Sequence, residues 1–350
     1  MQYQTLRRRL GLFGLLAACA VFLSACAQSG PQWGNSNARC CGRSLSWSMY
    51  VKAEELEAEG KMSEAAVWYE KSAERGYTWA QYRMGDIYAK GEGVEPNEEK
   101  AAFWYGKAAE ADIGWAQYQL AERYRQGSGI ERDLEQAVHY YTLAAENDVP
   151  YAQFALGERY RRGDGVPKDP ERAAQLFQQA ANVGNHWAQY ALGDSYKTGS
   201  GVPKDEEKAQ YWYAKSLPAF ERDAKQGNGW AQFKLAEAYR VGLGVAQDDE
   251  EAFRLYQGAA DAGISWAQYW AGEYYRNGTV PDKDPALAAT FYAEAAEQGN
   301  AWAEYRLGQL YAAGIGVPRD PRLAQEYYER AAAKGHEEAN LALLAEIGGS

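Results

Sequence analysis

The chain has 350 residues, 37 of them Lys or Arg and 48 Asp or Glu, which gives a formal net charge of -11. An acidic balance keeps a protein soluble and argues against nucleic acid or anionic lipid as the partner of a broad surface. Of the four cysteines, Cys19 and Cys26 lie at the N-terminal end, and the adjacent pair Cys40 and Cys41 has a spacing that fits neither a zinc framework nor a disulfide scaffold.

The first 25 residues have the layout of a secretory signal. Three arginines at 7–9 precede an apolar stretch from Leu10 to Phe22. The quartet LSAC that follows, Leu23 to Cys26, resembles the lipobox of bacterial lipoproteins. A plain signal peptide with a cysteine near its cleavage site is the alternative.

The lipobox resemblance implies cleavage before Cys26 and fatty acylation, for example by palmitate, of its thiol. Ala27, where some lipoproteins carry Asp, implies the outer membrane, and we expect the chain to face the periplasm. Cleavage would remove three arginines and leave 34 basic against 48 acidic residues, a formal charge of -14.

Residues 26–44 are rich in Gly, Ser and Asn, which predicts a flexible tether. The adjacent pair Cys40 and Cys41 within it could form a strained ring or bridge to a partner chain. Residues 45–77, with the turn EGKMSEA, predict a pair of helices that caps the N-terminal end of the fold.

From residue 78 a phrase such as NHWAQYALGDSY recurs, with a large aromatic residue directly before an alanine. Successive copies are separated by 36, 36, 36, 43, 36 and 36 residues. A fixed period of this size indicates stacked units, each unable to bury its apolar face alone, and so one elongated solenoid. The aromatic residues are Trp79, Trp115, Tyr151, Trp187, Trp230, Trp266 and Trp302, which we call the aromatic row.

Each unit predicts two helices. In the copy at Trp187 the first helix ends at GSGV, where Gly199 and Gly201 supply the positive φ of a helix exit. Asp205 is then placed to cap the second helix. Small residues and an aromatic pair on that second helix are suited to close packing between helices.

The pattern A-x-x-x-L-G-x-x-Y-x-x-G-x-G-V-x-x-D, followed by A-x-x-W/Y-Y-x-x-A-A-x-x-G, resembles the Sel1-like repeat, a relative of the tetratricopeptide repeat. The resemblance implies an all-α, right-handed superhelical solenoid of antiparallel helix pairs. It covers seven units over 78–336, followed by a capping helix at 337–347. Such proteins act as adaptors, and their first helices line the concave binding surface.

Two units depart from the pattern. The one at Trp266 reads NGTVPDKD, with Thr279 in place of the second turn glycine, where we expect a different bend. The one at Trp187 is seven residues longer, with SLPAFERDAKQGNG after its aromatic pair. We expect its second helix to run on by about two turns, to be kinked by Pro218, and to form a joint.

No catalytic residue, metal site or cofactor is predicted, and we expect the protein not to be an enzyme. The G-x-G turns follow helices and lack the Lys-Ser/Thr pair of a phosphate loop. We expect surface positions for His139, His186 and His336. A row of acids in the first helices has bases three residues later, which predicts mostly solvated ion pairs.

The aromatic row is the predicted binding face, because half-exposed indoles can stack on sugars or grip extended peptides. The alternative is that each ring packs against the preceding unit's second helix as a spacer. We expect a non-enzymatic, lipid-anchored scaffold that binds envelope proteins, for example in a secretion or polysaccharide-export assembly. A module binding peptidoglycan or exopolysaccharide along the row is the alternative.

Overall fold

A computed structural model describes residues 37–278 and 282–348, and in this part of the chain every regular element is an α-helix. The predicted all-α fold of consecutive antiparallel helix pairs is confirmed. The chain divides into two compact units, one up to Ala111 and one from Asp112. None of the described helices is long and apolar enough to cross a membrane.

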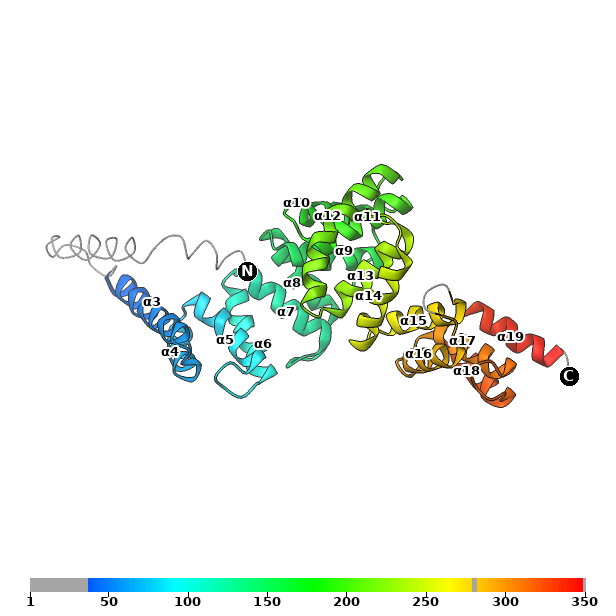
Figure 1. Cartoon of the computed structure of the whole chain (residues 1–350). Coiled ribbons are helices and arrows are strands. Elements are labelled where there is room, and N and C mark those ends of the chain that lie inside the picture. Colours follow the sequence, from blue (N-terminus) through cyan, green and yellow to red (C-terminus); the bar gives the residue numbers. More distant parts are fainter. Residues whose placement is uncertain (1–36, 279–281, 349–350) are drawn as a thin grey trace. The chain divides into compact units, whose positions relative to one another are not determined.

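The described part of the first unit holds four helices, drawn in blue and cyan in Figure 1. Helix α3 packs against α4, α4 against α5, and α5 against α6. Helix α3 begins eight residues before residue 45, inside the segment predicted as a tether. The bounds are α3 Asn37–Ala58, α4 Met62–Glu74, α5 Thr78–Lys90 and α6 Glu98–Glu110.

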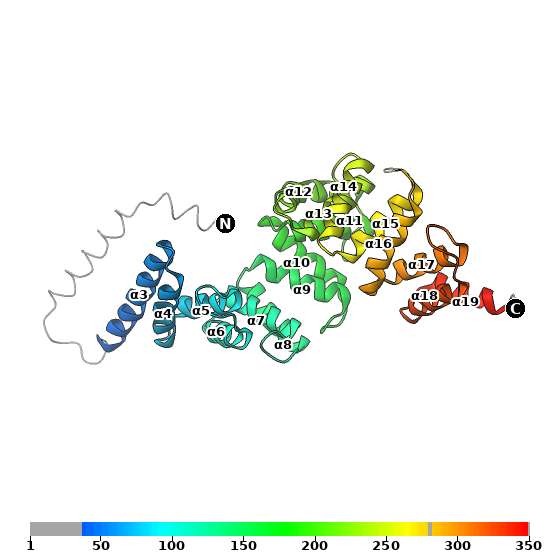
Figure 2. The same cartoon turned by 60° about the horizontal axis from the view of Figure 1, so that its bottom comes forward.

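The described residues of the second unit form six helix pairs and a last helix, and each helix packs against the next along the chain (Figures 1 and 2). The first helices of the pairs are α7 Gly114–Gln126, α9 Pro150–Arg162, α11 His186–Thr198, α13 Gly229–Val241, α15 Ser265–Asn277 and α17 Ala301–Ala313. The second helices are α8 Leu134–Glu146, α10 Pro170–Asn182, α12 Glu206–Lys225, α14 Asp249–Asp261, α16 Pro285–Glu297 and α18 Pro321–Ala333, and the last helix is α19 Glu337–Gly348.

The predicted helix exit and cap are found in the repeat at Trp187. Gly199 ends α11 with φ 77°, and the Asp205 side chain accepts a hydrogen bond from the Lys208 backbone N–H at 3.0 Å. Gly201, with φ 74°, lies so close to the preceding repeat that an added Cβ would be 1.9 Å from the Pro170 carbonyl oxygen. The second turn glycine is therefore required for the turn to rest on the start of α10.

Small residues of the first helices make room for aromatic rings of the second. A Cβ at Gly193 would lie 2.8 Å from Cδ1 of Tyr213, whose ring is fully buried. Ala188, which follows the row residue, is also fully buried. This packing of an aromatic ring onto a small residue recurs at Gly85, Gly157, Gly272 and Gly308.

The longer unit has the extended second helix that the sequence predicts. Helix α12 has 20 residues and continues through Pro218 as one helix. The added turns carry Phe220 into the core, where its ring is fully buried.

Several sequence predictions fall outside the described residues: the signal at 1–25, Cys26 and Thr279. Counted from Gly278, which matches Gly199, the second turn glycine is replaced by Val280 and not by Thr279. Val280 too lies outside the described residues.

Candidate interaction surface

Each residue of the aromatic row is the second residue of its first helix. Six of the seven side chains are between 39% and 51% exposed, and Trp187 alone is partly buried. The exposed six are Trp79 in the first unit and Trp115, Tyr151, Trp230, Trp266 and Trp302 in the second.

The neighbours of the row residue in the sequence hold the helix in place. Ala188 enters the core, and the amide of Gln189 donates a hydrogen bond to the Ala181 carbonyl at the end of the preceding helix, 3.1 Å away. Gln153 makes the same contact with Ala145 at 3.4 Å. Because side chains about 100° apart around a helix face different ways, these two anchors leave the row residue facing outward.

The exposed rings lie beside other aromatic rings of first helices. Trp115 is 6.3 Å from Tyr118 on its own helix and 5.9 Å from Tyr151 on the next first helix, between ring centroids. Trp302 in turn lies 6.5 Å from Tyr269 of the preceding first helix. Within the second unit, the row is thus part of an aromatic strip where α7 meets α9 and where α15 meets α17.

Trp187 differs because the extended helix α12 covers it. Its ring meets Phe220 edge to face, with centroids 4.8 Å apart. The imidazole of His186, itself buried, lies 4.7 Å from the same phenyl ring. The row is therefore interrupted at the repeat that carries the insertion.

The acids of the first helices and the bases three residues after them were predicted to form mostly solvated ion pairs, and this prediction is wrong for the most buried of them. The Glu273 side chain is only 8% exposed. It receives a hydrogen bond from the hydroxyl of Tyr292 at 2.6 Å, and it pairs with Arg276 at 2.8 Å and with Arg306 of the next repeat at 2.7 Å. Burial alone would raise the pKa of Glu273, but the hydrogen bonds from Arg276 and Tyr292, together with the charges of Arg306 and Arg276, outweigh it and lower that pKa.

The tyrosine contact was not expected from the i, i+3 spacing, because the tyrosine belongs to the second helix. It recurs between Tyr105 and Asp86 and between Tyr213 and Asp194, each at 2.6 Å, and between Tyr141 and Glu122. These acids therefore join the two helices of one repeat.

Two histidines are buried, which corrects the expectation of surface positions. His186 lies 3.1 Å from Asp223, and His336 lies 3.2 Å from Glu338. Burial lowers the pKa of both imidazoles. His139 is exposed as expected.

Sequence reasoning missed one buried charge. Glu304 is fully buried and pairs with Arg330 at 2.6 Å and with Lys334 at 2.7 Å. The signal was present in the sequence, because Glu304 stands where the other repeats of the W/Y-A-Q pattern have glutamine.

Within the described residues no three His, Cys, Asp or Glu side chains are grouped as metal ligands would be.

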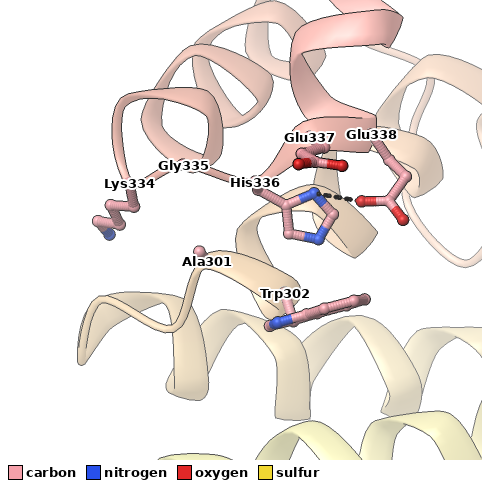
Figure 3. A pocket seen from close by; sticks show the side chains of 7 residues that line it. All are labelled: Ala301, Trp302, Lys334, Gly335, His336, Glu337 and Glu338. Atoms are coloured by element: carbon pink, nitrogen blue, oxygen red, sulfur yellow. Dashed lines mark ion pairs between the residues drawn. The ribbon is translucent and has the colours of Figure 1, made fainter. Parts of the chain in front are cut away.

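Next to Glu304 the surface has a depression of about 350 Å³. Figure 3 shows Trp302 on one side of it, and Lys334, His336 and the first turn of α19 on the other. It is a shallow site on the exposed edge of the aromatic strip.

Comparison with known proteins decides the family. The model of the Sel1 repeat matches eight segments: 60–77, 80–113, 116–149, 150–185, 188–217, 231–264, 267–300 and 303–336. The chain belongs to the Sel1 repeat family. The match at 60–77 lies in the segment for which a capping helix pair is predicted, and the other seven correspond to the predicted units.

Two solved structures are similar to the Sel1 repeat chain over most of its length. One is c5321, a protective antigen present in uropathogenic Escherichia coli strains, with 35% identity over 81% of this chain and a TM-score of 0.53. This chain spans 60% of that protein's length. The other is a Sel1 repeat protein from Oxalobacter formigenes, with 30% identity, 92% of each chain covered and a TM-score of 0.52.

A search of curated proteins gave no match. Sel1 repeats generally mediate protein–protein interactions and are generally non-catalytic scaffolds. The family therefore indicates protein–protein interaction as the general function, and the exposed aromatic row is a candidate surface for it.

Proposed function

We propose that this Sel1 repeat protein is a lipid-anchored scaffold of the bacterial envelope that binds partner proteins along the aromatic row. The observation that supports the binding face is the repeated half-exposure of a large aromatic side chain at one helix position. Aromatic residues are enriched where proteins meet, because they bury a large area at little entropic cost. In a repeat fold an aromatic residue at a repeated position can pack between repeats, yet six of the seven rings of the row remain exposed.

The anchor is proposed from the sequence alone. The signal-like segment and LSAC at 23–26 support acylation of Cys26, and Ala27 supports the outer membrane, with the repeats in the periplasm. We expect Cys26→Ser to move the protein from the membrane fraction to a soluble or uncleaved form and to abolish labelling by palmitate. Unchanged fractionation and labelling would refute the anchor without affecting the binding face.

The binding face is tested by photo-crosslinking in cells. A photoreactive phenylalanine analogue replaces Trp230 on α13 or, as a matched control, Tyr211 on α12, since both side chains are about half exposed. We expect crosslinked proteins at Trp230 and not at Tyr211. Equal yields at the two positions would contradict a role specific to the first helices.

The aromatic strip also supports a second candidate, glycan binding. The rings of Trp115, Tyr118 and Tyr151 lie within 6.3 Å of one another and form one cluster. Titration of the protein with peptidoglycan fragments or exopolysaccharide, followed by tryptophan fluorescence, tests it. Saturable quenching that Trp115→Ala abolishes, together with an absence of protein crosslinks, would favour the glycan over the protein partner.

A further inference from the structure

Arg240 on α13 differs from the arginines at the same position of other repeats, because it has no ion pair among the described residues. Four first helices carry an arginine three residues after an acid. Three of these arginines pair with that acid: Arg125 with Glu122 at 2.6 Å, Arg161 with Glu158 at 2.7 Å and Arg276 with Glu273 at 2.8 Å. Arg240 has Glu237 at the same spacing but does not pair with it.

A lysine that no other repeat has at its position holds Glu237 instead. Nζ of Lys234 lies 2.7 Å from the Glu237 carboxylate and 4.7 Å from the centroid of the Tyr190 ring. Side chains three residues apart share a helix face, so Lys234 and Arg240 flank the same carboxylate from opposite sides. Its pairing with Lys234 leaves the Arg240 guanidinium without an acid of its own helix.

The guanidinium of Arg240 is nevertheless held in one orientation. Its Cζ lies 4.0 Å from the centroid of the Trp270 ring on α15, and its Nε donates a hydrogen bond to the Tyr256 hydroxyl at 3.1 Å. In the described part of the chain the Nη groups have no hydrogen-bond acceptor, and the side chain is partly exposed. A guanidinium fixed in this way loses little freedom when it binds a planar anion.

The hydroxyl of Tyr256 provides a second, independent observation. Tyr256 is fully buried and its oxygen accepts from Arg240, so its own hydrogen can be donated, yet no described residue accepts it. In the repeats of Arg125 and Arg276 the corresponding hydroxyl donates to the carboxylate that the arginine binds: Tyr141 to Glu122 and Tyr292 to Glu273. Arg240 and Tyr256 are thus the two donors that hold a carboxylate in these other repeats.

We propose that Arg240 binds the carboxylate of an aspartate or glutamate side chain from a partner protein, with the Tyr256 hydroxyl as a second donor. A guanidinium and a carboxylate match in shape and charge and form strong hydrogen bonds. The inference rests on the proposed function, since the carboxylate would belong to a bound protein.

The site adjoins the aromatic row. The ring of Trp266 lies 5.9 Å from Tyr269, and Tyr269 lies 5.4 Å from Trp270, on which the guanidinium rests. A partner that covers Trp266 can therefore also reach Arg240. The net charge of -11 repels an acidic surface, so the site favours a partner with a single carboxylate here and not an acidic patch.

The test uses the full chain labelled with nitrogen-15 arginine and observed through its Nε–H signals by NMR. The Arg240 signal is identified by its loss in Arg240→Lys, and the signal of Arg276, the paired control in the same spectrum, by its loss in Arg276→Lys. The probes are N-acetyl-glutamate methylamide and its neutral analogue, N-acetyl-glutamine methylamide. We expect the glutamate probe to shift the Arg240 signal saturably and to leave Arg276 in place, and the glutamine probe to shift neither.

Two variants on α13 test whether the probe takes the place of an acid of the helix. Lys234→Gln frees Glu237 to pair with Arg240, so we expect it to weaken binding of the glutamate probe about two- to fivefold. In the Glu237→Gln background the same change should have no such effect, because no competing carboxylate remains. This double-variant comparison separates competition from the mere loss of a positive charge.

An equal response to both probes, no saturable shift of Arg240, or equal weakening by Lys234→Gln in both backgrounds would overturn the carboxylate site. A larger response to methyl phosphate, or a response to methyl glucuronide and none to the glutamate probe, would overturn the assignment to a protein side chain. None of these results alters the crosslinking comparison of Trp230 with Tyr211, so the two proposals can fail separately.

Discussion

Trp187 and Trp230 occupy the same position of the same sequence motif in neighbouring repeats, yet their surroundings differ. Trp230 is half exposed, and its ring contact is with Phe233 on its own helix, at 6.0 Å. Trp187 lies under Phe220 of the longer α12. The motif therefore sets the direction of the ring, and the length of the following helix decides whether the ring remains available to a partner.

The largest effect is expected from Phe220→Ala, which should cost about 3–5 kcal/mol in free energy of unfolding because a fully buried ring leaves a cavity. Chemical denaturation measures the loss. A cost below about 1 kcal/mol would show that the added turns of α12 are not part of the core. Tyr211→Ala, on the exposed face of the same helix, is the control.

A smaller effect is expected from Gly193→Ala, about 1–3 kcal/mol, because the new Cβ would lie 2.8 Å from the Tyr213 ring. The adjacent repeat has Ala236 at this position, where Ala236→Gly is the reciprocal variant. Thermal unfolding of both variants provides the comparison. An unchanged unfolding temperature in Gly193→Ala would contradict the close packing of the Tyr213 ring on Gly193.

Tyr213→Phe removes the hydroxyl that donates to Asp194 and should cost about 1.5 kcal/mol. In the next repeat Tyr256 accepts from Arg240 at 3.1 Å and bonds no carboxylate among the described residues, so Tyr256→Phe should cost less. Urea midpoints of the two variants measure the difference. Equal losses would mean that the tyrosine–carboxylate contact does not strengthen the insertion-bearing repeat.

His186 should give the insertion-bearing repeat a pH dependence. Burial lowers its pKa in the folded state, so the unfolded chain takes up the proton more readily. Its stabilising contribution is therefore present above pH 6.5, the ordinary pKa, and is lost as the pH falls through the lowered folded value.

Relative to His186→Asn, the native protein should thus lose more stability on acidification from about pH 7 to 5, as measured by urea unfolding at each pH. Above about pH 7.5, where His186 is unprotonated in both the folded and the unfolded state, the two pH profiles should run parallel. Parallel profiles over the whole range would exclude a contribution from His186, whose nearest charges are Asp223 and Arg222.

Much of this fold could be predicted from the repeat period, because a helix exit such as Gly199 and a cap such as Asp205 are local signals. The burial of Trp187 under Phe220 could not be predicted, because Phe220 lies 33 positions further along the chain and the contact depends on how α12 packs. The same holds for the hydroxyl of Tyr292 on Glu273, which joins two helices. The half-exposure of the aromatic row was predicted from the sequence, but its interruption at Trp187 was not.

The most direct test compares Trp187→Ala with Trp230→Ala in one experiment that measures both unfolding free energy and the yield of photo-crosslinks at Trp266. Trp187→Ala should cost about 2–4 kcal/mol and leave the yield unchanged in folded protein, because its partly buried ring packs against the core. Trp230→Ala should cost less than about 1 kcal/mol and reduce the yield. If Trp230→Ala instead destabilised the protein as much as Trp187→Ala and left the crosslinks intact, the aromatic row would be a packing device and not a binding face.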